Sequence, residues 1–229
     1  MDDAGREYIR EALKPEGESG EARAYIQNIR KPEGEAGARM LEGMNVGVHA
    51  RLSEWAFSFR RPGSGARALD VGCGGGANLA RLLSYCQEGS VTGADYSSTS
   101  VALSRGLVAD AVADGRCRVL QADAAELPLQ DESIDFVTAF ETVYFWPDVP
   151  KAFAEMARVL VPGGTFMIVN EVDGAHESDF KLVGVVDGFK VLVPEEVREL
   201  LSGAGFAVEE EHHHPRESWA VYIARKVGA

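Results

Sequence analysis

Three aspartates each follow a short run of apolar residues in the middle of the chain. Asp70 lies within ALDVGCGGGAN, which spans residues 68–78, Asp95 ends VTGAD and Asp123 ends LQAD. Each run is typical of a buried strand, so the three carboxylates fall at strand ends, where α/β proteins bind ligands. Four glycines (residues 72, 74, 75 and 76) follow Asp70 and let the backbone turn tightly against a ligand. This pattern predicts a ligand site at the carboxyl ends of parallel strands.

The first two aspartates indicate what kind of ligand fits. Gly72-x-Gly74-x-x-Ala77 alone also fits a dinucleotide site. However, Asp70 would repel a pyrophosphate and suits a cationic amino-acid group. Asp95, 25 residues after Asp70, can accept hydrogen bonds from both hydroxyls of a ribose. The competing interpretation is that Asp95 caps the next helix, although Ser97 or Ser98 could do so instead.

Together these motifs resemble those of the class I S-adenosylmethionine-dependent methyltransferases. The runs LQADAAELPLQDESIDFV and ARVLVPGGTFMI extend the resemblance, which is strong over residues 66–170 and moderate over 171–227. It implies S-adenosylmethionine as cofactor, with Asp70 at its methionine end and Asp123 and the backbone of Ala124 at its adenine. A turn cap is the competing interpretation of Asp123. The expected cofactor-binding set is Asp70, Gly72, Gly74, Asp95, Tyr96, Asp123, Ala124 and Phe140.

Methyl transfer from a sulfonium requires mainly an in-line arrangement and the exclusion of water, with a general base only if the acceptor holds its proton tightly. The candidate bases are His49, Glu141, Tyr144 and Glu171. Glu141 follows the fourth strand and Glu171 ends the fifth, while His49 lies near the polar edge of an expected helix. A surface histidine and core packing of Tyr144 are the competing interpretations.

Neither the other histidines nor the cysteines indicate a metal site. His212, His213 and His214 are consecutive on an expected strand, where side chains alternate between faces, and His176 lies in an irregular stretch. The three cysteines include no CxxC pair and no disulfide framework, which favours a reducing cytoplasm. We therefore expect no metal ligands.

The elements that must position these residues alternate between strand and helix from residue 66 onward. The alternation predicts an α/β fold, a doubly wound, seven-stranded, mostly parallel sheet with an antiparallel edge strand. Residues 63–229 form the expected Rossmann-like domain, and residues 1–62 a helical N-terminal extension. Helices are expected over 44–60 and 98–115, and a strand over 164–172. Copies of a repeat begin at Tyr8 and Tyr25, either as a surface duplication or with one copy as a lid.

Composition restricts the acceptor. The chain of 229 residues has 36 acidic and 23 basic side chains and a formal net charge of −13, which disfavours nucleic acid and anionic membranes. We expect a small-molecule acceptor. The alternatives are a methyltransferase acting on protein or RNA, a non-catalytic S-adenosylmethionine-binding module, and an NAD-dependent oxidoreductase. The oligomeric state stays open, with a homodimer as one option.

Overall fold

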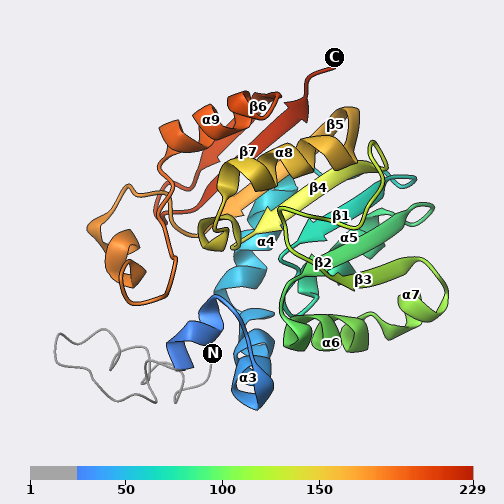
Figure 1. Cartoon of the computed structure of the whole chain (residues 1–229), viewed down its shortest axis with the longest axis horizontal. Coiled ribbons are helices and arrows are strands. Elements are labelled where there is room, and N and C mark those ends of the chain that lie inside the picture. Colours follow the sequence, from blue (N-terminus) through green and yellow to red (C-terminus); the bar gives the residue numbers. More distant parts are fainter. Residues whose placement is uncertain (1–24, 229) are drawn as a thin grey trace.

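A seven-stranded sheet forms the centre of the computed structural model, which describes residues 25–228. The strands run in the order β3-β2-β1-β4-β5-β7-β6, and β1 to β5 are parallel (Figure 1). β7 is antiparallel to both neighbours and lies one place inside the edge strand β6. The bounds are β1 Arg67–Val71, β2 Ser90–Asp95, β3 Cys117–Gln121, β4 Ile134–Phe140, β5 Leu160–Asn170, β6 Phe206–His213 and β7 Ala220–Lys226. The expected fold class is confirmed.

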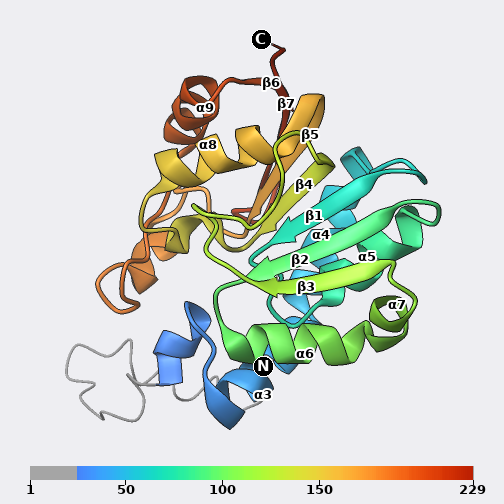
Figure 2. The same cartoon turned by 45° about the vertical axis from the view of Figure 1, so that its right-hand side comes forward.

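Helices cover both faces of the sheet because the parallel strands are apolar on both sides. One face carries α8 (Val149–Val159) and α9 (Pro194–Gly203), and Phe153 of α8 packs there against Phe166 of β5. The other carries α4 (Val48–Phe59), α5 (Ala77–Tyr85), α6 (Ser98–Leu107) and α7 (Ala109–Ala113), as Figure 2 shows. All three cysteines are buried and free.

Two expected helices are each broken in two. The helix expected over 44–60 is instead the end of α3 (Gly34–Met44) followed by α4, because Gly47 turns the chain with a φ of 71°. The helix expected over 98–115 is divided into α6 and α7 at Val108. The strand expected over 164–172 begins earlier, at Leu160, with Gly163 in the left-handed region. The break before α4 matters for function because it places His49 in the first turn of that helix.

The second copy of the repeat packs against the carboxyl end of β2. It forms η1 (Gln27–Ile29) and most of α3, whereas the copy that begins at Tyr8 lies outside the described residues. The Tyr96 hydroxyl donates to the Arg30 carbonyl at 2.7 Å, and the Ser97 hydroxyl donates to the Pro32 carbonyl at 2.5 Å. Residues 29–32 are thereby held next to the loop that carries Asp95. Among the described residues, no helix is long and apolar enough to cross a membrane.

Candidate active site

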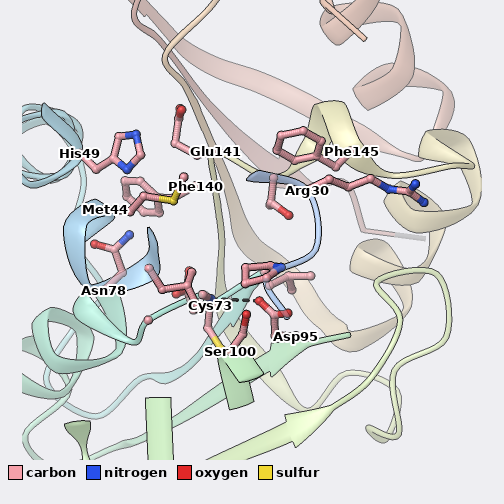
Figure 3. Close-up of a pocket in the computed structure, with 18 of the residues that line it drawn as sticks. Arg30, Met44, His49, Cys73, Asn78, Asp95, Ser100, Phe140, Glu141 and Phe145 are labelled. Atoms are coloured by element: carbon pink, nitrogen blue, oxygen red, sulfur yellow. Dashed lines mark hydrogen bonds between the residues drawn. The ribbon is translucent and has the colours of Figure 1, made fainter. Parts of the chain in front are cut away.

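A cavity of about 500 Å³ lies at the carboxyl ends of the parallel strands (Figure 3). All twelve predicted site residues line it, and the second copy of the repeat closes one side through Ile29, Arg30 and Pro32. The predicted residues are His49, Asp70, Gly72, Gly74, Asp95, Tyr96, Asp123, Ala124, Phe140, Glu141, Tyr144 and Glu171. Residues more than 120 positions apart in the chain therefore share one wall, although their individual roles stay predictions.

The glycine-rich loop has a backbone that other residues rarely adopt. Gly72 has a φ of 75°, and its N–H donates to the Ala94 carbonyl at 2.7 Å. A Cβ at this position would lie 2.3 Å from the Thr142 hydroxyl oxygen, far inside contact distance. Only glycine thus permits β1, the loop and the segment after β4 to meet.

Asp70 is a buried carboxyl group at the floor of the cavity. It accepts a hydrogen bond of 2.6 Å from the Thr138 hydroxyl. Burial raises the pKa of Asp70 to about 7, and the charge of Asp95 adds to this effect. A cationic group bound opposite Asp70 would favour its ionised form, which fits the predicted contact with the methionine end of the cofactor.

Asp95 connects the glycine loop to the start of α6. One carboxylate oxygen accepts from the Gly74 N–H at 3.0 Å and the other from the Ser97 N–H at 2.9 Å. The Ser97 hydroxyl itself caps α6 by accepting from the Ser100 N–H. The competing helix-cap role therefore belongs to Ser97. A carboxylate has about four acceptor positions, so Asp95 retains capacity for ribose hydroxyls.

Asp123 and Phe140 lie at different depths. Asp123 is exposed at the rim, where its side chain accepts from the Ala125 N–H at 2.8 Å. Asp123 therefore caps this turn, and its predicted contact with the adenine of the cofactor would be made in addition. Phe140 is buried, with its ring centre 5.2 Å from that of Phe57 in α4.

His49, Glu141 and Glu171 form a cluster at the other end of the cavity, which we call the acidic-histidine cluster. Nε2 of His49 lies 3.2 Å from a carboxylate oxygen of Glu171, and the Glu171 N–H donates to Glu141. Glu141 has a φ of 57°, a conformation that non-glycine residues keep only where surrounding contacts hold it. Figure 3 shows His49 and Glu141 at one end of the cavity and Asp95 at the other.

The cluster has unusual electrostatics. Burial raises the pKa of Glu141 to about 8, and the Glu171 charge adds to this effect. Burial would lower the pKa of His49, but its hydrogen bond to Glu171 and the two glutamate charges outweigh burial and raise it. Burial also raises the pKa of Tyr144 well above its usual value. The Tyr144 phenol is therefore protonated at neutral pH, and its role as a candidate base stays a prediction.

Several cavity residues carried no sequence signal strong enough to assign them. The Asn45 amide donates to the Gly75 carbonyl at 3.0 Å and so joins the end of α3 to the glycine loop. Arg30 lies in the repeat, and Phe145 and Phe189 form an apolar wall with Tyr144. Such residues are recognised only once the fold brings their segments together.

The remaining histidines lie away from the cavity. His212 contacts Glu210, His213 contacts Asp173 and Glu211, and His214 packs against Trp55 and Trp219. His176 is exposed before η3 (Glu177–Leu182). The three consecutive histidines thus have different partners, as strand alternation predicts.

Comparison with known proteins identifies the class. Residues 69–168 match the family described as "Methyltransferase domain". An O-methyltransferase of Pyrenophora dematioidea is 32% identical over 155 residues, which cover 66% of this chain and 57% of that protein. The 27-O-demethylrifamycin SV methyltransferase of Amycolatopsis mediterranei is 34% identical over 157 residues, covering 68% and 54%. A methyltransferase structure from Aquifex aeolicus has a TM-score of 0.66 at 20% identity, covering 83% of this chain and 98% of that one.

The motif series, the sheet order and these matches define one class. Residues 69–168 carry a methyltransferase domain, and the motifs and sheet order of the chain are those of class I S-adenosylmethionine-dependent methyltransferases, whose cofactor is S-adenosylmethionine. The chain spans about half the length of the curated relatives that it matches.

Proposed function

We propose that this protein transfers the methyl group of S-adenosylmethionine to a hydroxyl oxygen of a small-molecule acceptor. The observation that carries the proposal is that a single cavity joins the cofactor-binding end, at Asp70 and Asp95, to the acidic-histidine cluster. A cofactor whose ribose binds Asp95 and whose methionine end binds Asp70 would direct its methyl group toward this second end.

The shape of the cavity favours a small acceptor. Residues 29–32 close it on one side, and Leu182 and Phe189 contribute to the wall near Tyr144. A volume of about 500 Å³ lies within the range of small-ligand sites. The net charge of −13 opposes an RNA acceptor.

The acidic-histidine cluster favours oxygen as the acceptor atom. A hydroxyl must lose its proton as the oxygen forms a bond to the methyl carbon. The carbon–sulfur bond breaks, and its electron pair stays on sulfur to give S-adenosylhomocysteine. A cluster of two carboxylates and one imidazole can assist the loss of this proton. The O-methyltransferase names of the two relatives described above agree with this choice.

The first experiment is calorimetric titration with S-adenosylmethionine, S-adenosylhomocysteine and NAD. We expect binding of the first two and none of NAD. Asp95→Ala should weaken cofactor binding by about 10- to 100-fold, because hydrogen bonds to a charged group contribute about 1.5–3 kcal/mol. Asp110→Ala removes an exposed carboxylate of α7 and is the matched control for net charge.

The second experiment measures transfer itself. Protein and cofactor with a labelled methyl group are incubated with a panel of small hydroxyl, amine, thiol and carbon acceptors, and separately with cell lysate fractionated by size. We expect label in small hydroxylated compounds. Label only in protein or RNA would refute the small-molecule proposal, and binding without transfer would indicate a non-catalytic module.

A further inference from the structure

The acidic-histidine cluster has two carboxylates facing one imidazole, with no basic side chain against them among residues 25–228. One ligand atom from each of His49, Glu141 and Glu171 lies within 4.8 Å of the others. The three residues come from the first turn of α4, the end of β4 and the end of β5. Their convergence therefore depends on the tertiary fold and not on one local motif.

The His49 ring is positioned to bind either a proton or a metal ion together with Glu171. Its Nε2 lies 3.2 Å from a carboxylate oxygen of Glu171, so a proton on Nε2 satisfies both groups when no metal is bound. A neutral imidazole nitrogen is a common metal ligand, and a bound metal ion would replace that proton.

The Glu141 side chain is held in place by a backbone contact. Its Oε1 accepts from the Glu171 N–H. The left-handed backbone at Glu141 directs this side chain toward the cluster rather than along the strand. Such outer contacts orient a carboxylate ligand and limit its movement.

We propose that His49, Glu141 and Glu171 bind a divalent first-row transition-metal ion that holds the acceptor oxygen beside the cofactor methyl group. This rests on the proposed function. Bonds of about 2.0–2.2 Å would place opposite ligand atoms up to about 4.4 Å apart, so the observed spacing requires only a small contraction. Imidazole with carboxylates suits manganese, iron, cobalt or zinc better than magnesium or calcium. The bound ion would lower the pKa of the acceptor hydroxyl and fix its position.

Metal binding is tested directly, without an acceptor. Protein treated with a chelator is titrated with Mn²⁺ by electron paramagnetic resonance and with Zn²⁺ by calorimetry, with Mg²⁺ as comparison. We expect one ion per chain. His49→Ala and Glu171→Gln should each weaken binding by at least about tenfold, since loss of even an outer contact commonly costs this much.

His213→Ala is the matched control. His213 also contacts two carboxylates, those of Asp173 and Glu211, but through different ring nitrogens. The two carboxylates therefore lie on opposite sides of the ring and cannot bind one metal ion together with a single ring nitrogen. S-adenosylmethionine titration of every variant checks that the cofactor end remains folded. Absent binding, or binding that is equal in wild type, His49→Ala and Glu171→Gln, would overturn the metal proposal.

Activity then separates the two proposals. If protein treated with a chelator methylates a hydroxyl acceptor at the full rate, the metal proposal is refuted. The proposed function then stands, with His49 acting directly as a base. A rate that falls on chelation and returns with Mn²⁺ or Zn²⁺ would support both. One ion bound through the three residues, but no transfer to any acceptor, would support the metal site and refute the proposed function.

Discussion

Replacing Asp70 with asparagine should make the ligand-free protein more stable at neutral pH while weakening cofactor binding. Asp70 is only 2% exposed, and burial raises its pKa from 3.8 to about 7. Asparagine keeps an oxygen that can accept the Thr138 hydrogen bond but carries no charge. The substitution thus removes the cost of ionising a buried carboxyl group.

The sign follows from proton binding. Above the pKa of the unfolded chain, the folded protein retains a proton on Asp70 that the unfolded chain has released. Stability of the wild type therefore falls as pH rises, by about 1.4 kcal/mol per pH unit, until the folded group also ionises near pH 7. Between about pH 5.5 and pH 8 this amounts to about 2 kcal/mol, a loss that Asp70→Asn does not undergo.

The assay is urea denaturation of both proteins across this pH range, with Asp110→Asn as control for the change in net charge. The difference in unfolding free energy between Asp70→Asn and wild type should grow by about 2 kcal/mol toward pH 8. Calorimetry at pH 8 should show cofactor binding weakened by about tenfold or more, because the ammonium loses a charged partner. A stability difference that stays constant with pH would refute the reasoning.

Two further substitutions test the loop and the sheet. Gly72→Ala should destabilise the protein by about 2 kcal/mol or more and abolish measurable cofactor binding, because the left-handed backbone and the Thr142 side chain exclude a Cβ. Gly106→Ala, which meets no neighbouring atoms, is the control, and equal urea midpoints for the two variants would contradict this explanation. Asp135→Asn should cost no more than about 1 kcal/mol at neutral pH, since its ion pair with Arg67 is partly exposed. The hydrogen bond from Arg67 lowers the Asp135 pKa, so the stability that the ion pair contributes should disappear as pH falls below about 4. If urea denaturation shows the same loss of stability in Asp135→Asn at every pH, this explanation is wrong.

The end of the cavity that carries Asp70 and the glycine loop was predictable because its signals are local. Asp70 and the glycines are adjacent in sequence, and a strand followed by a glycine turn and a helix places them at a sheet edge almost without tertiary information. The role of Ser97 as the helix cap illustrates the limit. The sequence allowed either Asp95 or a serine to cap α6, and only the hydrogen bonds to Gly74 and Ser100 distinguish them.

The acidic-histidine cluster was predictable only residue by residue. The apolar spacing of Met44, Val48, Leu52, Trp55 and Phe59 suggested one continuous helix, yet Gly47 breaks it and Val48 is 39% exposed. The glycine's freedom to adopt a positive φ, which costs other residues energy, outweighed the helical periodicity. The sequence therefore predicted His49 as a candidate residue. It did not predict that His49 lies beside Glu141 and Glu171, because this position depends on the turn at Gly47.

Charge balance connects the two ends of the cavity. Asp70, Asp95, Asp123, Glu141 and Glu171 all line it, and S-adenosylmethionine would bring a sulfonium and an ammonium into it. Within the acidic-histidine cluster, desolvation makes two adjacent carboxylates costly unless a proton or a cation compensates them. Without a metal, protons on His49 and Glu141 compensate, because the pKa values of both residues are raised. A divalent ion would replace the proton that lies between Nε2 of His49 and Glu171, 3.2 Å apart, and would balance all three groups at once.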